Sequence, residues 1–215
     1  MNYLDVYYSY KEKPVNNYPI DLVCYLCCKF DIHWNTNVLD LGCGRGDFSA
    51  AFYYNDCNVV GIDKNKQLPI IPTTKKYTNT AEFKTFDFTH GLPLFKEEQF
   101  DIVFAKSIIE HIDNYDLLLK DIYKVLKPGG KLIIMTPSWR HLYKEFYDDY
   151  THKHPFTLDS LNRILQSYNF KVEYCKYFRQ LPFLWGLEYW DWDMLNIKKT
   201  IKFWKHVMLL GVGVK

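Results

Sequence analysis

The sequence lacks a long apolar segment. Its 215 residues contain no run of 18 consecutive apolar residues, and the first stretch, MNYLDVYYSYKEKP, has no apolar core of the kind that a signal peptide needs. Membrane-spanning helices and secretory leaders both depend on such a run. We therefore expect a cytoplasmic protein without a spanning helix, while peripheral contact with a membrane surface stays open as an alternative.

The six cysteines lack the spacing of a disulfide framework, so we expect reduced thiols. Cys24, Cys27 and Cys28 lie close together in YPIDLVCYLCCKF, an apolar stretch with helical spacing. A cysteine in such a stretch usually packs as a small hydrophobic residue. This interpretation is favoured over a metal site.

Neither sign of charge dominates the chain. Lysine and arginine number 27, aspartate and glutamate number 25, and only four of the basic residues are arginine. Proteins that follow a phosphate backbone need clustered basic side chains. A nucleic-acid partner is therefore disfavoured.

Apolar runs alternate with amphipathic stretches along most of the chain, a pattern typical of a parallel sheet with helices on both faces. We expect strands at 37–42, 57–63, 82–88, 99–106, 131–136, 171–178 and 205–215. Helices are expected at 47–55, 115–127 and within 157–170, with another opening at 107–112. A loop is expected at 64–81, and an aromatic insertion at about 180–204.

Three glycines follow the first expected strand on alternate positions, in VLDLGCGRGDF (38–48). Gly42, Gly44 and Gly46 give a bare backbone at the start of a helix, where N–H groups can approach a ligand closely. The dinucleotide fingerprint G-x-G-x-x-G needs a third glycine where this chain has Asp47. An acid at that place opposes a pyrophosphate, so a dehydrogenase is disfavoured and a ligand with some positive charge is favoured.

This glycine stretch resembles the first motif of class I S-adenosylmethionine-dependent methyltransferases. VVGID, FKTFDF, FDIVFAKSIIEHI, VLKPGGKLIIMTP and HPFTLDSLNRILQSYNFKVEY resemble further motifs of that superfamily, in the family's order. The resemblance implies a Rossmann-like α/β fold with a seven-stranded, mostly parallel sheet, helices on both faces and an aromatic lid or insertion near the carboxyl terminus. It implies one domain over 1–215, with an amino-terminal arm and helix (1–35), a cofactor-binding core (36–136) and acceptor-side and lid segments (137–215).

The resemblance also implies a site for S-adenosylmethionine, which leaves as S-adenosylhomocysteine. The glycines would wrap the amino acid part of the cofactor, Asp40 would orient its ammonium, and Asp63 would accept bonds from both ribose hydroxyls. Asp87 would meet the adenine amino group, with Phe88 as an apolar wall. The expected cofactor residues are Asp40, Gly42, Gly44, Gly46, Asp63, Lys64, Asp87, Phe88 and Lys106.

His111 is the expected catalytic residue, since it follows the fourth strand and can take a proton from an acceptor near neutral pH. His152 and His154 are rivals for this role. Its neighbour Glu110 is expected to point elsewhere, as a capping or packing acid. Some relatives build a magnesium site from Glu-x-x-Glu-His, but Ser107 stands at the first glutamate position, so no metal is expected.

The expected acceptor is an oxygen or nitrogen atom of a small molecule, such as a glycan precursor, a quinone or a natural-product intermediate. The chain reads AKSI where nucleic-acid amino methyltransferases carry Asn/Asp-Pro-Pro-aromatic. A non-catalytic cofactor-binding subunit and an RNA or protein methyltransferase stay open as alternatives. The expected acceptor residues are Trp139, Tyr143, Tyr150, His152 and His154, although aromatic residues beyond Trp139 can also serve as core, dimer interface or membrane contacts.

Overall fold

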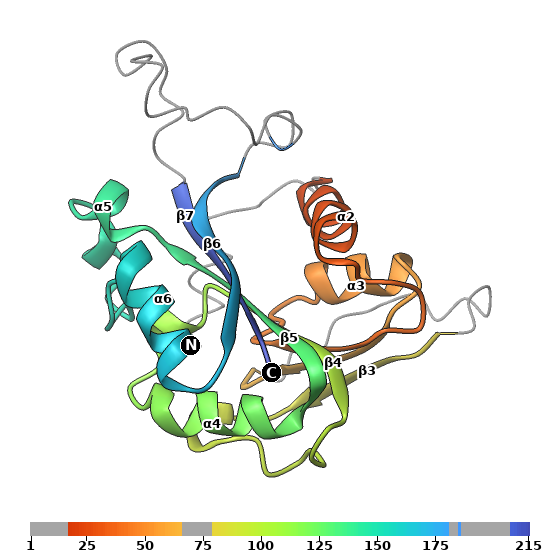
Figure 1. The fold of residues 1–215 in the computed structure, drawn as a ribbon. Helices are drawn as coiled ribbons and strands as arrows, with labels where there is room; N and C mark the ends of the chain where they lie inside the picture. Colours follow the sequence, from red (N-terminus) through yellow and green to blue (C-terminus); the bar gives the residue numbers. More distant parts are fainter. Residues whose placement is uncertain (1–16, 66–78, 181–184, 186–206) are drawn as a thin grey trace.

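A computed structural model describes residues 17–65, 79–180, 185 and 207–215 (Figure 1). The strands are β1 (Asn37–Leu41), β2 (Asn58–Asp63), β3 (Ala81–Thr85), β4 (Phe100–Lys106), β5 (Leu126–Pro137), β6 (Lys171–Arg179) and β7 (Val207–Val214). The helices are α2 (Tyr18–Phe30), α3 (Asp47–Tyr54), α4 (Tyr115–Val125), α5 (Trp139–Leu142) and α6 (Leu158–Ser167), with short 3-10 turns η1 (Phe88–His90), η2 (Ile109–His111) and η3 (Phe146–Asp148).

Within the described residues the strands form one seven-stranded sheet in the order β3-β2-β1-β4-β5-β7-β6. The strands from β3 to β5 pair in parallel, whereas β7 runs antiparallel to both β5 and β6. Carboxyl ends of parallel strands meet at one edge, where ligands of open α/β sheets bind. The predicted Rossmann-like α/β fold is confirmed.

Successive side chains of the central strands enter two separate cores. In β1, Val38 packs with Leu26 of α2, while Leu39 on the opposite face packs with Leu119 of α4. This period of two is expected when both faces of a sheet are covered, as Figure 1 shows for α2 and α3 on one side and α4 and α6 on the other. The first core also receives Phe52 of α3.

Two expected boundaries were wrong. The helix expected at 115–127 ends at Val125, because Leu126 already pairs with Phe100 at the start of β5. The glycines that follow stay in the strand, and their backbone pairs with Lys215 near the chain's last strand. The third strand stops at Thr85, so Asp87 and Phe88 lie beyond it.

The helix expected within 157–170 is α6. A capping box between Thr157 and Ser160 fixes its start. None of the helices in the described part of the chain is long and apolar enough to cross a membrane. The aromatic insertion expected at 180–204 and the loop expected at 64–81 fall almost entirely outside the described residues, as does the amino-terminal arm before Asn17.

Candidate active site

The glycine stretch forms a tight turn between β1 and α3. Gly42, Gly44 and Gly46 all have positive φ angles, of 69°, 53° and 79°, and Gly46 is the residue that precedes the first turn of α3. Residues with a side chain rarely adopt this conformation. The turn is fixed to β2 by Gly42, whose N–H donates to the carbonyl of Ile62 at 2.8 Å.

Gly42 also contacts the segment that follows β4. A Cβ atom added at Gly42 would lie 2.0 Å from Cδ1 of Ile108, a separation that real side chains do not reach. Ile108 directly precedes η2, which carries Glu110 and His111. The bare backbone at Gly42 therefore lets the ends of β1 and β4 lie against each other.

Asp63 ends β2 and faces the glycine turn. One carboxylate oxygen accepts a hydrogen bond of 2.9 Å from the N–H of Gly44. The other oxygen accepts bonds from the backbone and the side-chain amide of Asn65, at 2.8 and 2.6 Å. The carboxylate is therefore held in one orientation at the carboxyl edge of the sheet, beside Lys64, whose side chain is exposed.

Asp40 lies inside β1, whereas the other two expected cofactor acids, Asp63 and Asp87, lie at or just beyond the ends of strands. The residue is only 3% exposed, and its carboxyl accepts a hydrogen bond of 2.5 Å from the hydroxyl of Ser49 in α3. Burial raises the pKa of Asp40 to about 7, and the negative charge of Asp63 adds to this rise. Because its carboxyl is buried, Asp40 could orient a ligand ammonium only indirectly, through the backbone of the glycine turn.

Asp87 and Phe88 lie just past the end of β3. Asp87 is exposed and caps η1, accepting bonds from the backbone N–H and the hydroxyl of Thr89, which lower the pKa of its carboxyl. Phe88 is buried, and its ring lies 3.7 Å from the point where a Cβ of Gly42 would stand. Lys106, which ends β4, extends over the ring of Phe48 at 5.3 Å from its centre.

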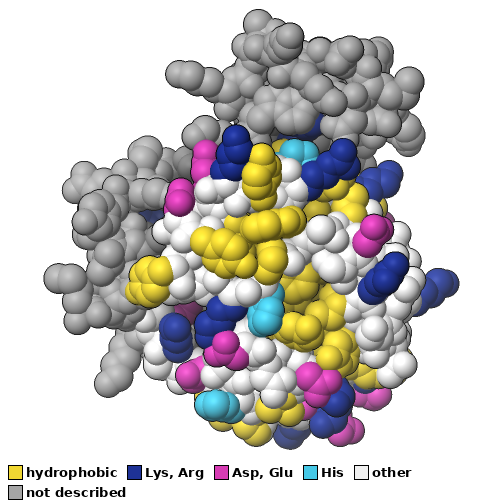
Figure 2. Space-filling view, turned by 90° about the vertical axis from the view of Figure 1, so that its left-hand side faces the viewer, with side chains coloured by type: hydrophobic (Ala, Val, Ile, Leu, Met, Phe, Trp, Pro, Cys, Tyr) yellow, Lys and Arg dark blue, Asp and Glu magenta, His cyan; other side chains and the backbone are white. Residues whose placement is uncertain are grey.

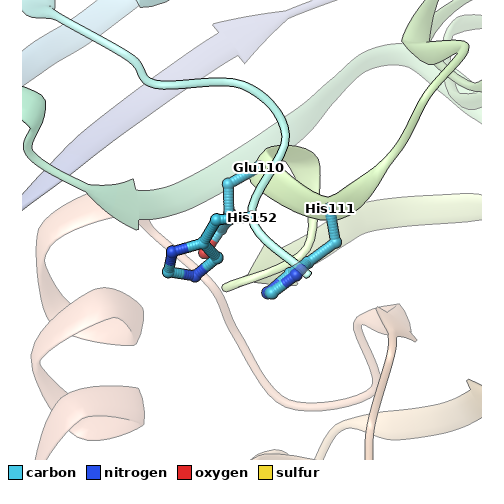
Figure 3. A group of neighbouring side chains, drawn as sticks. All are labelled: Glu110, His111 and His152. Carbon is cyan, nitrogen blue, oxygen red and sulfur yellow. The ribbon is translucent and has the colours of Figure 1, made fainter. Parts of the chain in front are cut away.

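Glu110, His111 and His152 form one group (Figure 3). One nitrogen or oxygen donor from each residue lies within 4.8 Å of the other two. The two imidazole rings are inclined to each other by 48°, with centres 4.7 Å apart. The expectation that Glu110 points away from His111 was therefore wrong. The reason is that η2 is a single 3-10 turn and that the backbone N–H groups of Lys153 and His154 bond to the carbonyl of Glu110, bringing His152 over the turn.

The hydrogen bonds of the two histidines define which ring nitrogen carries the proton. Nδ1 of His152 lies 2.6 Å from the carbonyl of Phe146, which can only accept, so Nδ1 is the donor. Thr151 donates its hydroxyl proton to Asp149 at 2.6 Å, so the same hydroxyl accepts from Nδ1 of His111 at 2.9 Å. Nε2 is consequently the nitrogen that carries the lone pair when either ring is neutral.

Glu110 is completely buried. Oε2 accepts a hydrogen bond of 2.9 Å from the hydroxyl of Thr136, while Oε1 accepts none within the described part of the chain. Burial raises the pKa of Glu110 to about 7, although its own backbone N–H, the Thr136 bond and the charge of Lys106 oppose the rise. Burial and the neighbouring His152 lower the pKa of His111, so its ring is neutral at pH 7.

The expected acceptor residues lie on the segment after β5. Trp139 packs edge-on against Phe146 at 5.5 Å between ring centres, and Phe146 stacks on His152 at 4.4 Å. Tyr143 and Tyr150 are 55% and 81% exposed, so they are not core residues. His154 packs against the ring of Tyr115, at 5.3 Å between centres, and lies outside the group formed with Glu110.

A family model described as a methyltransferase domain matches residues 16–174, so the chain belongs to that family. The predicted superfamily, the class I S-adenosylmethionine-dependent methyltransferases, and S-adenosylmethionine as cofactor are thereby confirmed.

Among curated proteins, the chain is similar to phosphoethanolamine N-methyltransferase 1 of Triticum aestivum, with 34% identity over 110 residues, which is 49% of this chain and 22% of that protein. It is 32% identical over 104 residues to the ubiquinone biosynthesis O-methyltransferase of Pelagibacter ubique, which is 47% of this chain and 42% of that protein. The chain thus spans less than half the length of these two relatives.

Two solved structures share the fold. A SAM-dependent methyltransferase from Archaeoglobus fulgidus superposes with a TM-score of 0.65 at 20% identity, and each chain is covered completely. The 1,6-didemethyltoxoflavin-N1-methyltransferase of Burkholderia thailandensis, solved with its substrate and S-adenosylhomocysteine, gives a TM-score of 0.65 at 17% identity over 92% of this chain and 76% of that one.

Proposed function

We propose that this protein transfers a methyl group from S-adenosylmethionine to an oxygen or nitrogen atom of a small molecule. The observation that carries the proposal is the contact between Gly42 and Ile108, which brings the expected cofactor turn against the segment with Glu110 and His111. A cofactor-binding half and a proton-handling half are thus adjacent at one edge of the sheet, as methyl transfer requires.

The residues at the glycine turn fit the cofactor. The turn presents backbone without side chains, and the Asp63 carboxylate beside it can exchange its bond to Gly44 for bonds to two ribose hydroxyls. Asp87 has an exposed carboxylate and Phe88 an apolar ring at the next strand end, which suits an adenine. When bound, S-adenosylmethionine supplies an electrophilic methyl group on a sulfonium.

His111 is proposed to take the proton that a hydroxyl or ammonium acceptor loses. Burial lowers the pKa of His111, which favours the neutral ring, and the bond from Nδ1 to Thr151 leaves the lone pair on Nε2. His152 also offers Nε2, because its Nδ1 bonds to the carbonyl of Phe146, and it is the main rival for this role. His154 packs on Tyr115 and is less well placed.

A small acceptor is favoured by the balanced charge of the chain and by the named substrates of its relatives, which include phosphoethanolamine, a ubiquinone precursor and 1,6-didemethyltoxoflavin. Figure 2 views the side of the molecule that carries α5 and α6 and shows hydrophobic side chains gathered there. We propose that Trp139, Tyr143 and Tyr150 of this side contact the acceptor, since flat aromatic faces suit sugar or ring substrates.

A screen of hydroxylated and aminated small molecules, monitored by release of S-adenosylhomocysteine, tests the proposal. We expect turnover with at least one small acceptor, and loss of that turnover in His111→Ala. Methylation of RNA or protein substrates alone would favour the macromolecular alternative. Cofactor binding with no turnover of any class would favour a non-catalytic subunit.

A further inference from the structure

We propose that Asp149 is a positioning residue for His111. Through the hydroxyl of Thr151 it orients the imidazole and stabilises the positive charge that the ring gains when it takes a proton from the acceptor. This role rests on the proposed function, in which His111 is the base, and it identifies the group that prepares that base. A continuous chain of hydrogen bonds supports it, together with the burial of the chain and the different way in which Asp149 meets His152.

The chain of hydrogen bonds leads from His111 to Asp149. Oδ1 of Asp149 accepts bonds from the hydroxyl and the backbone N–H of Thr151, at 2.6 and 3.0 Å. A hydroxyl has one proton, so the Thr151 oxygen accepts from Nδ1 of His111, at 2.9 Å. Nδ1 also lies 3.2 Å from the Thr151 carbonyl, which can only accept. Each bond therefore donates towards the carboxylate, and Nε2 of His111 keeps the lone pair.

A base held by a third group in this order is a common arrangement for proton transfer. The proton that the acceptor loses on methylation passes to Nε2 of His111, and the acceptor atom keeps the electron pair. The ring is then a cation, and its Nδ1–H becomes a stronger, charge-assisted donor. Asp149 stays ionised and stabilises this cation through Thr151, while no proton leaves Nδ1. The ring returns to its neutral form by releasing the Nε2 proton to solvent.

The charge of Asp149 acts where water screens it less than at the surface. Its side chain is 23% exposed, and His111 is half-buried. Burial lowers the pKa of His111, whereas the bond to Thr151 and the charge of Asp149 raise it. Within the described residues, further ionisable side chains around His111 are those of His152 and Lys64, whose charges lower its pKa, and of Glu110. Asp149 therefore opposes the cost of burying the protonated ring.

Asp149 also distinguishes the two histidines. Its other oxygen, Oδ2, lies 4.0 Å from Nε2 of His152, the nitrogen that carries the lone pair of that ring. A carboxylate at this place attracts a proton onto His152 and competes with an acceptor for the same nitrogen. By contrast, Asp149 reaches His111 through Nδ1 and leaves Nε2 to the acceptor. The position of this one carboxylate favours His111 over His152 as the base.

The first test follows the imidazole nitrogens of His111 and His152 by nitrogen NMR as the pH is varied, in the full chain without an acceptor. Asp149→Asn keeps an oxygen for the bonds from Thr151 and removes the charge, so it should lower the pKa of His111. Thr151→Val should lower it as well, whereas Thr151→Ser keeps the hydroxyl and should restore the wild-type value. Asp148→Asn, at the exposed acid next in sequence, is the control and should titrate like the wild type.

The second test measures turnover with an acceptor found in the screen. Asp149→Asn and Thr151→Val should each lower kcat by about 10- to 100-fold, the usual effect of a hydrogen bond to a charged group. Because both lower the pKa of the base, the acid limb of the pH–rate profile should move to lower pH. KM for the acceptor and affinity for S-adenosylhomocysteine should stay unchanged. The double variant should lose no more than Thr151→Val alone, since the chain is already broken at the hydroxyl.

A wild-type pKa of His111 in both variants would overturn the proposal. So would a change confined to His152, because Asp149 would then serve that ring, and so would a loss of kcat that leaves the pH profile in place. Circular dichroism checks folding, and Thr151→Val decides the question if Asp149→Asn does not fold. If the wild type turns over no acceptor, the proposed function fails, whereas the NMR titration still decides whether Asp149 acts on His111.

Discussion

The backbone N–H of Gly44 donates a hydrogen bond of 2.9 Å to the carboxylate of Asp63. This bond joins the glycine turn after β1 to the last residue of β2, so the two expected parts of the cofactor site form one unit. Asn65 holds the other carboxylate oxygen, at 2.6 Å from its side-chain amide. Since a bound ribose would compete for the same oxygens, cofactor binding and the shape of the turn should be coupled.

Replacing Gly42 by alanine should destabilise the protein more than the same change at Gly129. Both glycines have positive φ angles, of 69° and 77°, so both variants carry similar backbone strain. A Cβ at Gly42 meets Ile108 at 2.0 Å, whereas one at Gly129 meets nothing within 4 Å. Overpacking of this kind costs about 1–3 kcal/mol in addition. Urea unfolding measures the difference, and equal losses in the two variants would show that Ile108 moves aside without cost.

Asp40→Asn should remove part of the pH dependence of stability. The pKa of Asp40 is about 7 in the folded protein and near 3.8 in an unfolded chain, so unfolding releases a proton between these values. The wild type therefore loses free energy of unfolding as the pH rises from about 4 to 7. Asparagine does not titrate, so the variant does not lose this stability as the pH rises. Its free energy of unfolding relative to that of the wild type should therefore increase by about 3 kcal/mol from pH 5 to pH 8.

Unfolding by urea at both pH values measures this gain. The exposed Asp47→Asn is the matched control and should follow the wild type at each pH. If the stability difference between Asp40→Asn and the wild type is the same at pH 5 and pH 8, the carboxyl of Asp40 is not held protonated by burial.

His111→Ala should lower turnover by about two to four powers of ten, the usual effect of losing a general base. Affinity for S-adenosylhomocysteine should stay nearly unchanged. His111→Gln should restore little if the ring takes a proton, and much if it only orients the acceptor. His33→Ala, at an exposed histidine before β1, is the control and should keep the turnover of the wild type. Full turnover of His111→Ala from pH 6 to 9 would remove His111 from the proton transfer.

Tyr150→Ala and Tyr143→Ala should raise KM for the acceptor several-fold without changing cofactor affinity. Both side chains are exposed on the segment proposed to contact the acceptor. Trp34→Ala is the matched control, because Trp34 is 75% exposed but precedes β1, at the opposite edge of the sheet from the site. If all three variants have the KM of the wild type, Tyr143 and Tyr150 do not contact the acceptor.

Much of the sheet could be predicted from the sequence, since each central strand is a short apolar run followed by glycine or charged residues. Asp63 could be found because it ends such a run. The burial of the Asp40 carboxyl could not be predicted, because it depends on the contact with Ser49 of α3, which the pattern of residues does not reveal.

The proximity of Glu110, His111 and His152 could also not be predicted from their spacing in the sequence. Neighbouring residues on a long helix point in different directions, but η2 is a single turn covered by the chain around His152. The backbone bonds from Lys153 and His154 to Glu110 create that arrangement. They join segments distant in sequence, and the residues alone give no sign of them.

Calorimetric titration with S-adenosylhomocysteine tests the central claim most directly, with the wild type, Asp63→Ala and the control Glu97→Ala, an exposed acid that precedes β4 at the opposite edge of the sheet. The wild type and the control should bind with equal affinity. Loss of two hydrogen bonds to a charged acceptor should weaken Asp63→Ala by about 2–4 kcal/mol, or about 30- to 1,000-fold in Kd. Unchanged affinity in a folded Asp63→Ala protein would contradict a cofactor site built on Asp63 and the glycine turn.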